Sequence, residues 1–129
     1  MRTESIIVVY GSNQAIAEEI AYRLGATTIS VQELTHRNIE NSKSMILGID
    51  LTSDGLSPSW QYALQILQKE DLCGKTFAEY VALGNAHDYA EEFCEMLREQ
   101  GARVVGNIQY VTSPQWNIDS WTGTLSPSI

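Results

Sequence analysis

Five short apolar runs, separated by segments of helical periodicity, constrain the fold of this chain more than any other feature. The first run, residues 5–10, is continuous and β-branched, as expected for a parallel strand that is buried on both faces. Four similar runs follow, at residues 27–31, 44–49, 76–83 and 103–111. Strands that alternate with helices form a parallel sheet between two helical layers. The sequence therefore predicts an α/β fold, a doubly wound five-stranded parallel sheet with helices on both faces.

Amphipathic segments between these strands predict the helices. The predicted helices are residues 14–24, 60–68 and 89–100, and a short last helix that begins at Ser113 and Pro114. Ser12 or Asn13 can cap the first helix, and Gly25 is suited to end it. Residues 32–41 have little helical signal and predict a polar connection, and residues 50–59 predict a loop rich in Asp, Ser, Thr, Gly and Pro.

Length and charge limit the classes of function. The 129 residues predict one domain, residues 1–129, and a content of 43% hydrophobic and 19% charged residues is typical of a globular protein. No apolar run approaches the roughly 18 residues of a membrane span, and the first run is too short for a signal peptide. We therefore expect a cytoplasmic monomer. The formal charge of -8 repels phosphate backbones, so we expect no nucleic-acid partner. An acidic surface suits docking on basic proteins, although charge alone favours a simple role in solubility.

Isolated reactive side chains give weaker signals. Cys94 lies on the apolar stripe of a predicted helix and is expected to be buried, while Cys73 lies in a turn without a base beside it. Neither cysteine has metal-ligand spacing, so no metal site is predicted. His36 and His87 are expected to be solvated, and Ser12 has no base positioned to activate it as a nucleophile.

The ligand site of such a sheet is predicted at the carboxyl ends of its strands, where the strand order switches. The loops that reach this edge are residues 11–13, 50–59 and 84–88. Asp50, Asp54 and Asp88 lie in these loops. They do not predict a phosphoacceptor site, because such a site needs an acidic pair after the first strand and a lysine after the last.

Three stretches of this chain, in order and over nearly its whole length, resemble the flavodoxins, which are small FMN-containing electron carriers. They are residues 8–21, residues 45–60 and residues 74–106, and the best match within the last stretch is residues 82–94. The chain is shorter than is usual in that family, and the missing length falls after the fifth strand. The resemblance implies the flavodoxin fold, FMN as cofactor and redox proteins that dock on an acidic surface.

The resemblance also implies which residues contact the flavin ring. In the third loop, Gly84 and Asn85 take the places of a Gly-Asp pair that contacts the pyrimidine edge, and Tyr89 takes the place of a tyrosine that stacks on the ring. Asp88 belongs to the same implied site. The second loop often carries an aromatic residue in the family; here Leu51, Thr52 and Ser53 occupy that region, and Trp60 is expected to be core.

The first loop departs from the family pattern, which is roughly Ser/Thr-x-Thr-Gly-x-Thr around the phosphate. Aligned without gaps, this chain offers Ser12, Asn13, Gln14 and Ala15 as implied phosphate contacts, and only Ser12 keeps its hydroxyl. Backbone amides and the helix dipole remain as donors. The loss of two hydroxyls is expected to weaken phosphate binding by roughly 10²- to 10⁴-fold.

Two functions from different classes follow, of which the first is the leading hypothesis and the second is the alternative. The first is an FMN-binding electron-transfer protein of flavodoxin type, a carrier rather than an enzyme with its own substrate. The second is a flavodoxin-like domain that has lost FMN and acts as a binding or regulatory module. The altered first loop favours the second function, and the third loop favours the first.

Overall fold

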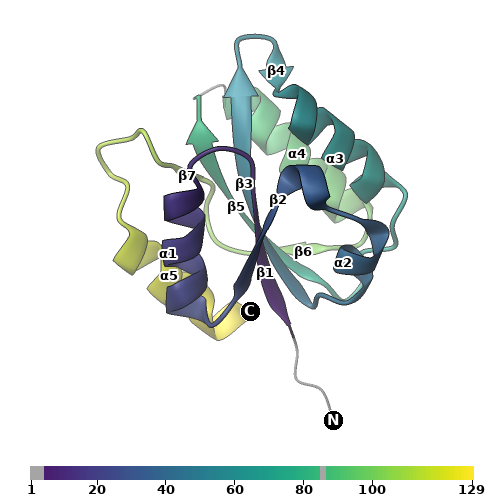
Figure 1. Ribbon diagram of the computed structural model, residues 1–129, viewed down its shortest axis with the longest axis horizontal. Helices are drawn as coiled ribbons and strands as arrows, with labels where there is room; N and C mark the ends of the chain where they lie inside the picture. The colour runs from purple at the N-terminus through teal and green to yellow at the C-terminus, as the bar shows by residue number, and fades with distance from the viewer. Residues whose placement is uncertain (1–4, 85–86) are drawn as a thin grey trace.

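A parallel sheet forms the centre of the protein, which is described by a computed structural model over residues 5–84 and 87–129. Its main strands run in the order β2-β1-β3-β5-β6 (Figure 1): β1 (Ile6–Tyr10), β2 (Thr27–Ser30), β3 (Ser44–Thr52), β5 (Thr76–Leu83) and β6 (Arg103–Val104). All neighbours along this order pair in parallel. The predicted fold class is confirmed: the sheet is parallel and helices flank it.

Two helical layers cover the two faces of the sheet (Figure 1). On one face lie α1 (Gln14–Leu24) and α5 (Ile118–Leu125), which pack with β1 residues such as Val8 in one buried cluster. On the other face lie α3 (Pro58–Gln68) and α4 (His87–Glu99), whose apolar residues form the larger cluster with the sheet. Apolar burial on both faces explains why the strands read as continuous apolar runs.

Helix α1 begins and ends as its sequence predicts. The side chain of Asn13 accepts a hydrogen bond from the backbone N–H of Ile16 at 3.3 Å, so Asn13 rather than Ser12 is the cap. Gly25 ends the helix with a φ of 68°, in the left-handed region that glycine adopts without strain. These local signals fix the position of the first loop relative to β1.

The prediction of a non-helical connection at residues 32–41 is wrong. A 3₁₀ turn, η1 (Val31–Glu33), ends the second strand one residue early, and a short helix, α2 (His36–Glu40), follows it. The helix is started by a capping box: Thr35 accepts from the N–H of Asn38, whose side chain accepts from the N–H of Thr35.

The third strand is longer than predicted, and part of the predicted loop 50–59 is strand. β3 continues through Thr52 and folds back on itself, because Leu51 and Thr52 pair antiparallel with the short strand β4 (Gly55–Leu56). Gly55 has a φ of 129°, which favours glycine at this return. The hairpin projects beyond the sheet at the carboxyl end of β3 (Figure 1).

The last predicted strand and the last helix also differ from their predicted limits. Residues 103–111 form two short strands, β6 and β7 (Gln109–Tyr110), which both pair with β5 and are separated by a turn at Gly106, where φ is 73°. Helix α5 begins at Ile118 with Asn117 as its cap, because Ser113 instead closes a turn by accepting from the N–H of Gln115. Helices α3 and α4 each begin two residues before their predicted starts.

Tyr80 packs directly on Gly48, and this contact yields a test of the core. A Cβ atom at Gly48 would lie 2.4 Å from the Tyr80 hydroxyl, and Tyr80 is fully buried. Gly48→Ala should therefore lower the free energy of unfolding by about 1–3 kcal/mol, as overpacking does. Gly123→Ala is the matched control, since nothing lies within 4 Å of that position and alanine in a helix should stabilise by about 0.5–1 kcal/mol. Urea denaturation that finds both variants equally stable would contradict this packing.

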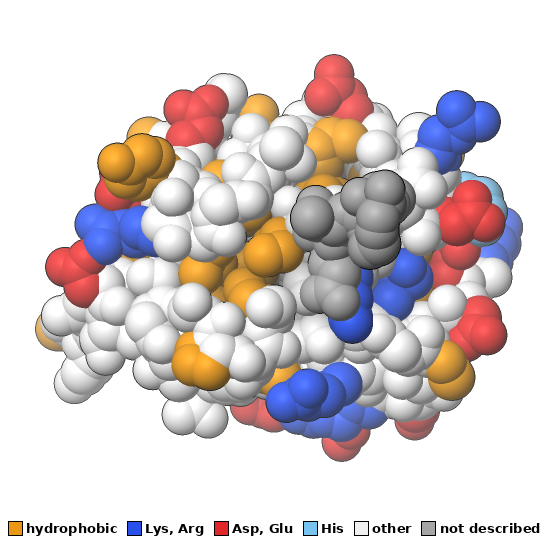
Figure 2. All heavy atoms as spheres, turned by 90° about the horizontal axis from the view of Figure 1, so that it is seen from below, with side chains coloured by type: hydrophobic (Ala, Val, Ile, Leu, Met, Phe, Trp, Pro, Cys, Tyr) orange, Lys and Arg blue, Asp and Glu red, His pale blue; other side chains and the backbone are white. Residues whose placement is uncertain are grey.

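Charges of both signs surround the amino ends of the strands, the end of the molecule that Figure 2 shows. Lys75 holds the backbone here, because its Nζ donates to the carbonyl of Ser42 at 2.6 Å. An acidic docking surface therefore does not extend over this end. Within residues 5–84 and 87–129, no helix is long and apolar enough to cross a membrane.

Candidate functional site

The three predicted ligand loops come together at one edge of the sheet. β1, β3 and β5 are neighbours and run parallel, so their carboxyl ends and the loops after them lie at the same edge. The chain leaves β1 to form β2 on one side and later β3 on the other, which makes this edge the switch point of the sheet. The predicted location of the site thus corresponds to a real cluster of loops.

Asp50 binds the first loop. Its carboxylate accepts a hydrogen bond from the backbone N–H of Ser12 at 2.9 Å and another from the Ser12 hydroxyl at 2.7 Å. The register explains this contact: Tyr10 is paired with Gly48, so the residues two positions further along the chain come side by side, Ser12 just beyond the end of β1 and Asp50 within β3. Asp50 is 7% exposed. Both anion-binding donors of Ser12 are therefore used within the chain.

Gly11 allows this close approach. A Cβ atom at Gly11 would lie 2.2 Å from the Oδ2 atom of Asp50 and 3.0 Å from the Nε1 atom of Trp60. Any side chain at Gly11 would displace the carboxylate from Ser12. The first loop and the end of β3 thus fit each other closely.

The other three predicted phosphate residues lie at the start of α1. Asn13 uses its side chain as the cap, and Gln14 donates from its Nε2 atom to Glu18 at 2.8 Å. Ala15 is exposed in the first turn of the helix. These residues lie at the carboxyl edge of the sheet, and the contact of Asp50 with Ser12 was not predicted. The sequence does contain a signal for this contact, because Asp50 is the one charged residue in the apolar strand β3.

The second loop is held as a hairpin rather than as a free ligand loop. Leu51 is 3% exposed and belongs to the larger core cluster. The Thr52 hydroxyl donates to the carbonyl of Gly55 and accepts from the N–H of Asp54, both at 3.2 Å. Ser53 is exposed in the turn. Of the three predicted residues, one is core and one stabilises the turn.

The third loop contacts the hairpin. Gly84 has a φ of 90°, and a Cβ atom there would lie 2.6 Å from the carbonyl oxygen of Leu51. Asn85, the predicted partner of Gly84, lies outside the described residues. Tyr89 is 37% exposed, and its ring lies 3.3–3.6 Å from where a Cβ atom of Gly55 would stand. The second and third loops therefore touch each other at two points.

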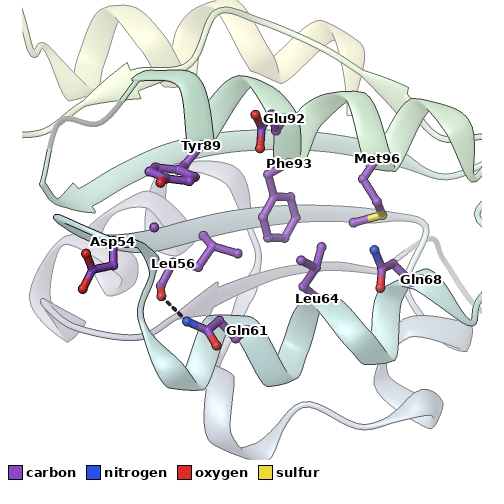
Figure 3. A pocket seen from close by; sticks show the side chains of 10 residues that line it. Asp54, Leu56, Gln61, Leu64, Gln68, Tyr89, Glu92, Phe93 and Met96 are labelled. Carbon is purple, nitrogen blue, oxygen red and sulfur yellow. Dashed lines mark hydrogen bonds between the residues drawn. The ribbon is translucent and has the colours of Figure 1, made fainter.

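Tyr89 also closes one end of a groove between α3 and α4 (Figure 3). This groove has a volume of about 310 Å³. Its lining comes from the hairpin, α3 and α4: Asp54, Gly55, Leu56, Gln61, Leu64, Gln68, Tyr89, Glu92, Phe93 and Met96. Asp88, the remaining predicted contact, is exposed beside Tyr89 in the first turn of α4. The groove was not predicted, because its walls lie on two helices that only the tertiary fold brings together.

Glu79 is a buried ionisable group that was not predicted. It lies on β5 and is 2% exposed; its Oε1 atom accepts from the Sγ atom of Cys94 at 3.5 Å, and its Oε2 atom has no hydrogen-bond partner among the residues that the structure describes. Burial raises the pKa of Glu79 to about 8, opposed by the hydrogen bond from Cys94 and reinforced by the charge of Glu91. A single glutamate within the apolar run 76–83 was the signal for this group.

The remaining candidates are structural or exposed. Trp60 is fully buried and meets Phe93 edge to face, with ring centroids 5.9 Å apart, as predicted for a core residue. Cys94 is buried, as predicted, and Cys73 is exposed. His36 is exposed, and its Nδ1 atom lies 2.5 Å from Glu70, a contact that raises the pKa of His36. Over the described part of the chain, no three His, Cys, Asp or Glu side chains are grouped to hold a metal ion.

Solved structures match this fold over almost its whole length. A flavodoxin from Streptococcus pneumonia TIGR4 aligns with a TM-score of 0.80 at 14% identity, covering 96% of this chain and 99% of that chain. A short-chain flavodoxin associated with a non-canonical PDU bacterial microcompartment aligns with a TM-score of 0.81 at 11% identity, covering 98% and 99%. The chain has a flavodoxin-like fold. No family model and no curated protein sequence matches it.

A third neighbour is a flavodoxin from Fusobacterium nucleatum in complex with flavin mononucleotide, with a TM-score of 0.67 at 18% identity; 98% of this chain and 92% of that chain are covered. At such identities the likeness establishes the fold alone.

Proposed function

We propose that this chain is a flavodoxin-like domain that works without FMN, as a binding or regulatory module. The observation that supports this most is the Asp50 carboxylate on the two donors of Ser12. Ser12 is the one residue of the first loop that keeps the hydroxyl expected at a flavodoxin phosphate site. In this chain that hydroxyl and the adjoining N–H already bind an anion, and the anion is part of the protein.

Electrostatics make this arrangement unfavourable for a phosphate. A phosphate group bound at Ser12 would carry up to two negative charges within a few ångströms of the Asp50 carboxylate. Two unit charges 4 Å apart interact by about 1 kcal/mol in water and about 4 kcal/mol at the effective dielectric constant near a protein surface. The phosphate would also have to replace two charge-assisted hydrogen bonds, each worth about 1.5–3 kcal/mol. Ser12, Asn13, Gln14 and Ala15 therefore do not fit the phosphate of FMN.

The loops implied as ring contacts support the same function. Leu51 is core, Gly84 lies against its carbonyl, and Tyr89 lies against Gly55. A planar ring between the second and third loops would have to separate these contacts. Groups of the chain itself thus make the contacts that the phosphate and the flavin ring of FMN would need at this edge.

FMN-dependent electron transfer is the second candidate function. It is favoured by the likeness to flavodoxins along nearly the whole chain and by the position of Gly84 and Tyr89 at the ligand edge. In that case the flavin would supply the redox chemistry, and the protein would set its potential and its access to partner proteins. Cytoplasmic location and docking of redox partners on acidic residues belong to this candidate.

Titration of the purified wild-type protein with FMN separates the two functions. We expect no saturable quenching of flavin fluorescence at micromolar FMN, and no yellow colour in protein purified from its native host. Riboflavin, which has the same ring without the phosphate, serves as the parallel probe. Saturable quenching by FMN together with a reversible potential in spectroelectrochemical titration would establish the electron carrier and reject the proposal.

A further inference from the structure

The groove between α3 and α4 has a preformed apolar floor. Leu56, Leu64, Phe93 and Met96 point into it from the hairpin and from both helices (Figure 3). Phe93 packs edge to face against Trp60, which is fully buried, and this contact fixes the position of the Phe93 ring. A concave site of about 310 Å³ lies at the lower end of the sizes that small-molecule sites span.

Polar groups are placed on the rim of this groove rather than on its floor. The Nε2 atom of Gln61 donates to the carbonyl of Leu56 at 2.8 Å, which fixes that amide beside the hairpin (Figure 3). Tyr89 stands at one end with 37% of its surface exposed. Asp54 and Glu92 are the acidic groups of the lining, and no lysine or arginine is among the described residues that form it. The charged side chains in the described part of the lining are therefore both acidic.

We propose that this groove binds a small planar aromatic ligand that carries a positive charge. Its ring would lie on the floor against Phe93 and Leu64, and its cation would face Asp54 and Glu92. Tyr89 adds an aromatic face that attracts cations. A negatively charged aromatic ligand of the same size would meet two carboxylates and no cation. The groove lies beside the carboxyl edge, and its occupation does not depend on whether FMN binds there.

A pair of indoles with opposite charge tests this inference. Tryptamine carries an ammonium group, and indole-3-acetate carries a carboxylate on the same ring. In two-dimensional NMR of the labelled wild-type protein, tryptamine should shift the methyl signals of Leu64 and Met96 in a saturable manner. Indole-3-acetate should bind at least tenfold more weakly. Equal affinity for the two probes, shifts confined to another part of the protein, or no shifts at all would each overturn the proposal.

A matched pair of variants on α4 isolates the charge. Glu92→Gln removes a carboxylate from the rim, and Glu95→Gln makes the same change at an exposed position outside the groove. Removing one opposite charge near a partly exposed site should weaken tryptamine binding about fivefold. Glu95→Gln should leave tryptamine affinity unchanged. If Glu92→Gln binds tryptamine as tightly as wild type does, the carboxylates are not part of a binding site.

Discussion

Glu79→Gln should remove most of the loss of stability that the wild-type protein shows between about pH 5 and pH 8. Burial on β5 raises the pKa of Glu79 to about 8, from the ordinary glutamate value of 4.5. The folded protein therefore binds a proton on Glu79 that the unfolded chain releases at lower pH. Glutamine has nearly the same shape and no ionisable proton, so the variant lacks this linkage.

The sign and the size of the effect follow from the two pKa values. Because the folded pKa is raised, its contribution to stability is fully present below about pH 4.5 and is lost as the pH rises through about 8. At 1.36 kcal/mol for each pH unit, the wild-type protein should lose on the order of 3–5 kcal/mol of unfolding free energy over this range through Glu79. At alkaline pH the variant should be the more stable of the two proteins.

Urea denaturation at a series of pH values measures this difference. Glu95→Gln is the control, because it makes the same chemical change at an exposed position on α4. The difference between wild type and Glu79→Gln should grow as the pH rises, while the curve of the control should stay parallel to that of wild type. Parallel curves for all three proteins would show that Glu79 titrates in the folded state as it does in water.

Asp50→Ser should increase the affinity of the protein for FMN by roughly 10²- to 10⁴-fold. The substitution shortens the side chain and removes its charge, which frees the N–H and the hydroxyl of Ser12 for an external phosphate. Two recovered charge-assisted hydrogen bonds and the loss of one repulsive charge account for this range. Asp50→Asn keeps the shape without the charge, so its gain in affinity should be smaller.

Fluorescence titration with FMN and with riboflavin measures the effect. The gain should be confined to FMN, because riboflavin has no phosphate. Asp54→Ser is the control, because Asp54 is exposed in the hairpin turn, whereas the Ser12 hydroxyl donates to Asp50. An equal gain for both flavins, or the same gain in the control, would show that Asp50 does not occupy a phosphate position.

Much of the fold could be predicted because its signals are local. The apolar runs and the cap of α1 at Asn13 depend on neighbouring residues alone. The extension of β3 could not be predicted in this way, because it depends on the return at Gly55 and on pairing with β4. Helix α2 was missed although its capping box is local, since Thr35 and Asn38 lie in a polar segment without apolar periodicity.

In the candidate site, too, some features follow from the local sequence and others depend on tertiary contacts. Its place at the carboxyl edge follows from the strand order, and the sequence predicted the loops that meet there. The contact of Asp50 with Ser12 depends on the register between β1 and β3, which the sequence does not specify to one residue. Tyr89 was predicted beside a flavin ring, but its contact with Gly55 depends on the hairpin.

A crystal structure of the wild-type protein grown with excess FMN tests the central claim most directly. We expect that the Asp50 carboxylate still accepts both hydrogen bonds from Ser12 and that no phosphate lies at the start of α1. A phosphate on the N–H of Ser12, with the Asp50 side chain turned away and the flavin ring between Tyr89 and the hairpin, would contradict it.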